Sequence, residues 1–102
     1  MKKFILTIGL NDKDTYTQKF DTITAYKMIE DTLKSYTNGY TIYETKGGYK
    51  HDNGTYITET SIRVELMFIE KTQVLIIAKQ LKTILNQESI GYEEITSNQQ
   101  YI

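Results

Sequence analysis

The first hydrophobic residues of the chain alternate with other residues, as in a strand that buries one face. Those on the side expected to be buried are Phe4, Leu6, Ile8 and Leu10. This period of two predicts a strand over Lys3–Leu10. The polar segment Asn11–Asp14 then interrupts the pattern and predicts a turn.

Two later segments show the three-to-four-residue spacing of an amphipathic helix. The first can be capped by Asp21 or Thr22 and stops at Asn38-Gly39. Its expected buried face carries Ile23, Tyr26, Ile29, Leu33 and Tyr36. The second can be capped by Thr72. Its apolar stripe consists of Val74, Ile77, Ala78, Leu81, Ile84 and Leu85.

A long hairpin, Tyr40–Ile69, is predicted between the two helices, with its reversal at Asn53-Gly54. Asn-Gly favours a two-residue type I′ turn, because both central residues need a positive φ. The second arm, Thr55–Ile69, contains no Gly or Pro, and at about 3.3 Å per residue it would reach roughly 50 Å if straight. A domain of this size has a radius of gyration of about 13 Å. The arm must therefore bend, or leave the domain and meet another chain.

The predicted turn sets the register of the hairpin. It places Tyr43 opposite Val64 on one face and Glu44 opposite Arg63 on the other. Paired glycines inside a strand usually mark a bulge or a close approach of backbones. Gly47-Gly48 is thus where we expect the first arm to bend, and the register beyond it stays open.

A short last strand, Ser89–Ile95, completes the order β-α-β-β-α-β. That is the order of a ferredoxin-like α+β domain, in which an antiparallel sheet carries two helices on one face, here with a long central hairpin. No repeat or linker divides the sequence, so we expect a single domain over residues 1–102. The other face of the sheet must be solvated or covered by a partner.

Composition excludes several classes of partner, site and cellular location. The formal net charge is −1, which gives no general attraction to a long nucleic acid or an anionic membrane. The absence of Cys excludes disulfides, thiol catalysis and thiolate metal sites. The N-terminus begins like a signal peptide, but its apolar run stops at Gly9, and no run approaches the ~20 residues that span a bilayer. We expect a cytoplasmic protein.

No group of residues carries a catalytic signature. His51 is the only histidine and lies beside the hairpin turn, without a nucleophile or a pocket, so we interpret it as a solvated loop residue. The oxygen-rich segment Asn11–Asp14 lacks the spacing of a calcium loop and is interpreted as a turn. Glu93 and Glu94 are neighbours on a strand, so they point to opposite faces and cannot share a pocket. We expect neither a metal nor another cofactor.

The outward face of the long strand offers two hypotheses for Arg63, which is the only arginine. It can pair with Glu44 across the strands or diagonally with a neighbour, which is worth well under ~1 kcal/mol when exposed. Alternatively, it can hold a phosphate. Ile57, Met67 and Ile69 share that face. Exposed apolar residues on a long strand usually form a partner surface, and a second copy of the chain is the simplest partner.

Asn86 and Gln87 follow the second helix and also allow two interpretations. They can hold the unpaired carbonyl groups at the end of the helix. Alternatively, their amides can read a purine edge or ribose hydroxyls. Their spacing does not decide between these roles.

Four segments together resemble a small phage family. They are Leu6–Asp12 (LTIGLND), Tyr40–Tyr49 (YTIYETKGGY), Glu59–Glu65 (ETSIRVE) and Leu85–Ile90 (LNQESI). In length and segment order the chain resembles the first type of Thoeris anti-defence protein, a sponge for cyclic ADP-ribose signals. The resemblance covers nearly the whole sequence.

This resemblance implies a binding protein rather than an enzyme. Such proteins sequester, in the host cytoplasm, the cyclic nucleotide made by a bacterial TIR-domain defence enzyme, and they do not degrade it. Members form dimers and higher rings with pockets at subunit boundaries, and some also take up cyclic oligonucleotides.

The resemblance also implies which residues bind the ligand. Aromatic rings would stack on adenine, amides would contact its polar groups, and cationic side chains would meet phosphate. The residues in these roles are Asn86, Gln87, Arg63, Tyr43, Tyr49 and Lys46.

Two other functions stay open on the residues alone. A protein-binding inhibitor could use the hairpin edge for strand addition. A small dimeric enzyme could use a cleft of the same scaffold, since the fold does not decide function.

Overall fold

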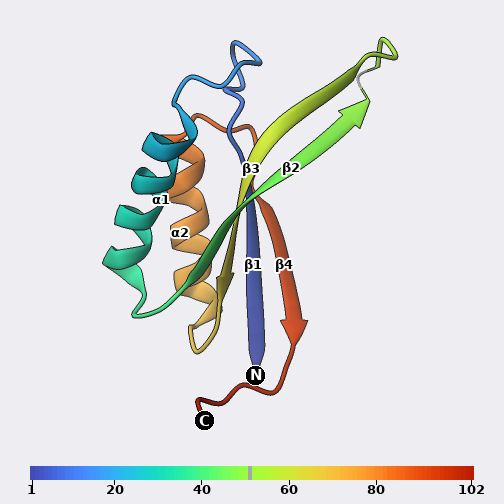
Figure 1. Cartoon of the computed structure of the whole chain (residues 1–102). Coiled ribbons are helices and arrows are strands. Elements are labelled where there is room, and N and C mark those ends of the chain that lie inside the picture. The colour runs from blue at the N-terminus through green and yellow to red at the C-terminus, as the bar shows by residue number, and fades with distance from the viewer. Residues whose placement is uncertain (51) are drawn as a thin grey trace.

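A four-stranded antiparallel sheet with two helices on one face makes up the computed structural model, which describes residues 1–50 and 52–102 (Figure 1). The interpretation of His51 thus lies outside the described residues. The elements are β1 (Lys2–Gly9), α1 (Thr22–Tyr36), β2 (Thr41–Lys50), β3 (Tyr56–Leu66), α2 (Lys71–Ile84) and β4 (Gly91–Thr96). The strand order β2-β3-β1-β4 and the β-α-β-β-α-β succession confirm the predicted ferredoxin-like α+β fold.

The core lies between the helices and the middle of the sheet. The alternation predicted for the first strand is correct, because Phe4, Leu6 and Ile8 are buried on the helix side. They meet the equivalent face of β3 and the inner faces of both helices, which contribute Ile62, Val64, Leu66, Ile29, Leu33, Val74, Ile77 and Leu81. The opposite face of the sheet carries no helix (Figure 1).

The two helices begin differently. Asp21 caps α1 as predicted, and its Oδ1 accepts the N–H of Thr24 at 2.8 Å. Ile23 is 71% exposed and was wrongly placed on the buried face, because six residues before Ile29 is about 120° around the helix. The predicted cap at Thr72 is also wrong. Glu70 has extended backbone and holds the N-cap position without a side-chain bond, so α2 begins one residue before Thr72.

The hairpin register differs by one residue from the prediction. Tyr43 lies opposite Arg63, and Glu44 lies opposite Ile62. The connection between Lys50 and Tyr56 is longer than two residues. Among residues 52–55 of this connection, only Gly54 has a positive φ, of 86°, whereas a type I′ turn at Asn53-Gly54 needs positive φ at both residues. The neighbouring Asn53 instead accepts the N–H of Thr55 with its side chain, at 3.0 Å.

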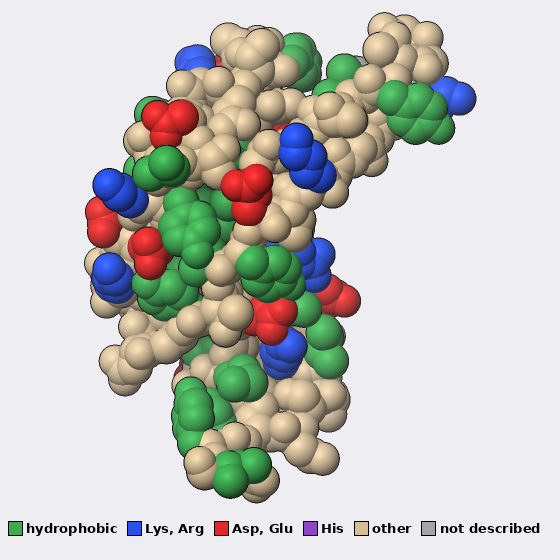
Figure 2. Space-filling model, in the orientation of Figure 1, with side chains coloured by type: hydrophobic (Ala, Val, Ile, Leu, Met, Phe, Trp, Pro, Cys, Tyr) green, Lys and Arg blue, Asp and Glu red, His purple; other side chains and the backbone are tan. Residues whose placement is uncertain are grey.

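The predicted bulge at Gly47-Gly48 is absent from the strand ladder. Gly47 pairs with Glu59 and Gly48 pairs with Thr58, in the same register as the rest of the hairpin. The length of the arm is accommodated by leaving the body of the domain, which gives the molecule extents of 47 × 25 × 23 Å. Figures 1 and 2 show the outer part of the hairpin projecting from the body of the molecule.

The second arm of the hairpin also ends earlier than the predicted Ile69. β3 stops at Leu66, and the positive φ of Phe68, 54°, turns the chain toward α2. Ile69 is therefore not on the outward face with Arg63, because it packs against the core. Met67 is exposed beyond the end of the strand, and Phe68 stacks on Tyr101 with ring centroids 5.0 Å apart. Of the predicted outward apolar set, Ile57 alone belongs to the strand.

Within the described part of the chain, no helix is long and apolar enough to cross a membrane.

Candidate ligand-binding groove

A groove of about 480 Å³ opens on the helix-free face of the sheet, where β1 ends. We call it the Gly9 groove. Its floor is formed by the sheet, and its walls come from the β1–α1 connection, the outer part of the hairpin and the α2–β4 connection. The lining residues that matter below are Gly9, Asp12, Lys13, Tyr49, Glu59, Gln87 and Glu88.

Glu59 is fixed on the floor of this groove. Its Oε2 accepts the backbone N–H of Asn11 at 2.9 Å. Its carboxylate lies over Gly9, where a Cβ atom would come within 2.5 Å of Oε1. Because real Cβ contacts are not that short, this position of Glu59 depends on glycine in β1.

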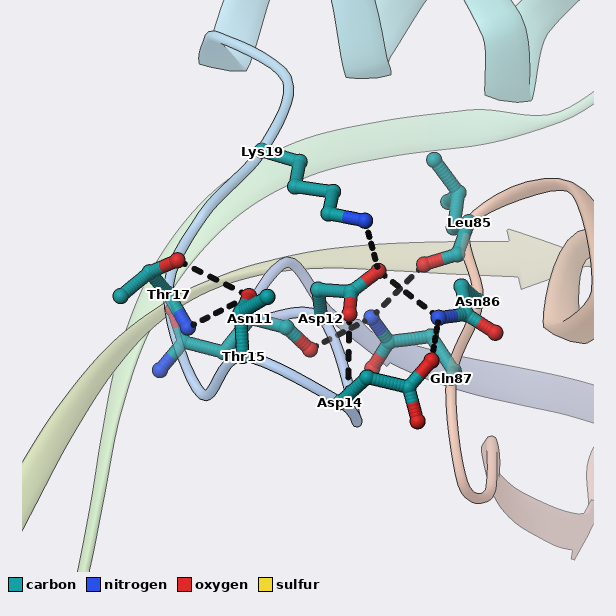
Figure 3. Close-up of polar contacts among 9 residues, drawn as sticks. All are labelled: Asn11, Asp12, Asp14, Thr15, Thr17, Lys19, Leu85, Asn86 and Gln87. Carbon is teal, nitrogen blue, oxygen red and sulfur yellow. Dashed lines mark hydrogen bonds and ion pairs between the residues drawn. The ribbon is translucent and has the colours of Figure 1, made fainter.

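One wall is held in place by Asp12, whose side chain is only 4% exposed (Figure 3). Its Oδ2 accepts the N–H of Asp14 at 3.0 Å, and its Oδ1 accepts an amide N–H of Asn86 at 2.9 Å. The ammonium of Lys19 lies 3.6 Å from Oδ1. The hydrogen bond from Asn86, more than any other contact, lowers the pKa of Asp12 below its ordinary value. The carboxylate is therefore ionised at neutral pH.

Asn86 and Gln87 fasten this wall to the end of α2 (Figure 3). Asn86 has a positive φ of 48°, and its amide also donates to Asp14 Oδ2 at 2.8 Å. The amide of Gln87 donates to the carbonyl oxygens of Asn11 and Leu85, at 2.8 and 3.2 Å. Gln87 thus holds a carbonyl group at the end of α2, as the first interpretation predicts. The same interpretation is wrong for Asn86, whose amide donates to two carboxylates of the β1–α1 connection instead. Contact of either residue with a ligand stays a prediction.

The structure brings some of the predicted ligand-binding residues together and separates others. Tyr49, from the hairpin, and Gln87, from the α2–β4 connection, both line the Gly9 groove. Tyr43 and Arg63 are cross-strand neighbours on the same face of the sheet, outside the groove lining. Lys46 occupies a strand position of the opposite parity, so its side chain belongs to the other face of the hairpin.

The outward face around Arg63 is crossed by ion pairs. Arg63 lies 3.6 Å from Glu93, and not beside Glu44 as predicted, because the shifted register puts Glu44 on the other face. Glu65 is bonded by Lys3 at 2.9 Å and by the hydroxyl of Tyr43 at 2.8 Å. Both bonds lower the pKa of Glu65 below its ordinary value, and the bond from Lys3 has the larger effect.

Glu93 and Glu94 do point to opposite faces, as expected. Glu93 faces Arg63, whereas Glu94 is 2.8 Å from Lys71 at the start of α2. Nowhere in residues 1–50 and 52–102 do three or more His, Cys, Asp or Glu side chains form a group that could hold a metal ion.

Sequence reasoning missed Glu59 and its relation to Gly9. A lone glycine inside a strand was the available signal, because it often marks a close approach of another group. The identity of that group depends on the pairing of β1 with β3, which places Gly9 opposite Ser61, two residues from Glu59.

The charges that line the groove are predominantly negative. Asp12, Glu59 and Glu88 contribute three carboxylates, against the single ammonium of Lys13. Lys19 offsets part of the charge of Asp12 from outside the lining. Such a groove favours a cationic ligand over a pyrophosphate, because like charges repel across a partly desolvated surface.

No protein-family model matches the sequence, and no curated protein matches it either. Solved structures share the fold. A phage SAM lyase in complex with S-methyl-5′-thioadenosine is 19% identical, with a TM-score of 0.62 over 94% of this chain and 89% of that one. The periplasmic divalent cation tolerance protein CutA from Archaeoglobus fulgidus is 12% identical, with a TM-score of 0.65 over 99% and 88%.

A third structure, the GlnK–ATP complex of B. subtilis, is 14% identical, with a TM-score of 0.55 over 92% of this chain and 82% of that one. At these identities the comparisons establish the shared fold. Two of the three structures hold a ligand with an adenosine group.

Proposed function

We propose that this protein binds S-adenosylmethionine (SAM) in the Gly9 groove and cleaves it, as a SAM lyase. The observation that carries the proposal is the acidic groove with Glu59 fixed on its floor. SAM combines an adenosine group with a sulfonium and an α-ammonium, so it is a net cation. The fold shared with a phage SAM lyase that holds S-methyl-5′-thioadenosine supports the same ligand class.

The proposed reaction needs no nucleophile from the protein, which agrees with a sequence that lacks a catalytic signature. Release of S-methyl-5′-thioadenosine breaks the bond between the sulfonium and the γ-carbon of the methionine part, and the electron pair goes to sulfur. The carboxylate of the substrate itself can attack that carbon and close a five-membered lactone. The protein then has to bind the substrate, fold it into the reactive conformation and exclude water.

Specific residues have roles in this proposal. Glu59 faces the cationic part of SAM, and the ring of Tyr49 offers a stacking surface for adenine. Gln87 contributes to the wall that holds the adenosine end. The first two roles involve direct contact with substrate.

The test is to incubate the protein with SAM and measure S-methyl-5′-thioadenosine by chromatography. Glu59→Gln keeps an acceptor for Asn11 but removes the charge, and we expect the rate to fall by about tenfold or more. Glu44→Gln is the matched control, since Glu44 is exposed on the other face of the hairpin. A wild-type rate equal to that of SAM alone would reject the lyase proposal.

A second candidate is the sequestration of a cyclic ADP-ribose isomer by a phage counter-defence protein, without degradation. The observation that favours it is that Tyr49 and Gln87, two residues implied by the family resemblance, line one groove. Incubation with the cyclic nucleotide followed by heat denaturation should then return the ligand intact. A thermal shift with the cyclic nucleotide, but none with SAM, would favour this candidate over the lyase.

A further inference from the structure

A second pocket, of about 350 Å³, lies next to the Gly9 groove and shares Lys13 and Gln87 with it. Three lysines line it, so we call it the three-lysine pocket. Its lining consists of Lys13, Lys79, Lys82, Thr83, Asn86 and Gln87. Its charge is thus opposite to that of the Gly9 groove.

The three ammonium groups come from segments far apart in the sequence. Lys79 and Lys82 are three residues apart on α2, so they share one side of the helix. Lys13 belongs to the β1–α1 connection, and its backbone N–H donates to the carbonyl of Asn86 at 3.1 Å. The buried Asp12 beside it and the amide of Asn86 fix that connection (Figure 3). The backbone that carries Lys13 is therefore held beside α2.

These lysines are not neutralised within the described chain. Among residues 1–50 and 52–102, no carboxylate lies within 4.0 Å of the ammonium nitrogens of Lys13, Lys79 or Lys82. The acidic side chains next to the pocket are Asp12 and Asp14, which accept hydrogen bonds from the amide of Asn86 at 2.9 and 2.8 Å. Lys19, outside the pocket, lies 3.6 Å from Asp12 and offsets part of its charge. The three lysines of the pocket thus outnumber the two carboxylates beside it.

A purely structural role explains only part of this arrangement. A lysine in the last turn of a helix interacts favourably with its dipole, which accounts for Lys82. It does not account for Lys79, which lies before the last turn, or for Lys13, which comes from another segment. Converging like charges repel, so their arrangement around one pocket favours an anion.

We infer that the three-lysine pocket binds a phosphorylated small molecule, anchored by a phosphate or pyrophosphate group. Ammonium groups are rotatable donors that suit phosphate oxygens. A volume of about 350 Å³ is within the range of small-ligand sites. The inference does not depend on the proposed cleavage of SAM, because the two sites have opposite charge and separate linings apart from Lys13 and Gln87.

The experiment is a titration of isotope-labelled protein with inorganic pyrophosphate, ADP and adenosine, followed by NMR. The reporters are the side-chain amide of Asn86 and the backbone amide of Lys82, because both residues line the three-lysine pocket and neither lines the Gly9 groove. We expect pyrophosphate and ADP to shift both signals in a saturable manner. Adenosine, which lacks phosphate, should leave them in place.

Two matched double variants distinguish specific binding in the pocket from nonspecific electrostatic attraction of the anion. K79Q/K82Q removes two of the three pocket charges, and we expect pyrophosphate binding to weaken by about tenfold or more. K27Q/K34Q removes the same charge from α1 and should leave the affinity within about twofold. If K79Q/K82Q is poorly folded in a thermal melt, Lys13→Gln tests the same site from the other segment.

Either of two results would overturn the inference. One is the absence of a saturable shift up to about 10 mM pyrophosphate. The other is an equal loss of affinity in K79Q/K82Q and K27Q/K34Q, which would indicate nonspecific attraction. Release of S-methyl-5′-thioadenosine from SAM, measured on the same proteins, reports separately on the Gly9 groove.

Discussion

The carboxylate of Glu59 occupies the space that a side chain at position 9 would need. A Cβ atom on Gly9 would lie 2.5 Å from Oε1 and 2.6 Å from Oε2 of Glu59. Gly9 has no left-handed backbone conformation, so its role is to allow this close approach. Because Gly9 in β1 has no side chain, the carboxylate of Glu59 in β3 can occupy this position.

Gly9→Ala should therefore displace Glu59 without unfolding the protein. The conflict involves the far end of a flexible side chain, so we expect mainly the loss of its bond to Asn11, which costs about 1 kcal/mol of unfolding free energy. Urea denaturation measures this cost. We also expect the affinity for SAM, measured by calorimetric titration, to fall in both Gly9→Ala and Glu59→Gln.

Gly47→Ala is the control for that experiment. A Cβ atom on residue 47 would make an ordinary contact, 3.8 Å from Ser61 Oγ. Gly47→Ala therefore introduces the same substitution into a strand without displacing Glu59. Wild-type ligand affinity in Gly9→Ala would show that Glu59 does not bind the ligand.

Asp12→Asn should destabilise the wall of the groove. Both carboxylate oxygens accept N–H groups, from Asp14 and from Asn86, and an amide would turn one acceptor into a donor facing another donor. We expect the melting temperature to fall by about 5 °C or more. Asp31→Asn, on the exposed face of α1, should leave it nearly unchanged.

The effect of Asp12→Asn should also depend on pH in a defined direction. The folded pKa of Asp12 lies below its ordinary value of 3.8, chiefly because Asn86 donates a hydrogen bond to it. The stability that the ionised carboxylate contributes is therefore complete above about pH 3.8 and is lost as the pH falls toward the folded pKa. The difference between wild type and variant should be constant from neutral pH down to that point and then shrink. A difference that grows on acidification would contradict this account.

Local features of the fold could be predicted because they depend on neighbouring residues. The cap at Asp21 is a bond to a residue three positions away, and the burial of Phe4, Leu6 and Ile8 on the helix side follows the alternation of β1, although Ile5 is also buried. Ile23 shows the limit, because apolar character alone does not place a residue in the first turn on the buried face.

Long-range features could not be read from the sequence. The hairpin register depends on the conformation around Asn53-Gly54, and a difference of one residue moved Glu44 away from Arg63. The Gly9 groove requires the pairing of β1 with β3 and the fastening of Asn86 to Asp12, which is 74 residues away. Neither relation has a periodic signature.

Gln87→Glu tests how the α2–β4 connection is held. Gln87 is 7% exposed, and its amide nitrogen donates to the carbonyls of Asn11 and Leu85. A carboxylate of the same shape would place negative charge against two carbonyl oxygens in a buried position. We expect a loss of about 3 kcal/mol in unfolding free energy, measured by urea denaturation. Gln100→Glu on the exposed tail is the control, and an equally small effect of both changes would contradict the bonding described.

Engineered cysteines can test the hairpin register directly, because the natural sequence has none. Tyr43 lies opposite Arg63, and directly opposite residues of antiparallel strands have Cα atoms about 4.5–5.5 Å apart, within the range of a disulfide. We expect Y43C/R63C to form an intrachain disulfide on mild oxidation, measured by mass spectrometry after proteolysis. The matched pair E44C/R63C should remain reduced, because residues 44 and 63 belong to opposite faces of the hairpin. Rapid oxidation of E44C/R63C, with Y43C/R63C unreacted, would instead indicate the register of a two-residue turn at Asn53-Gly54 and would move Arg63 away from Tyr43.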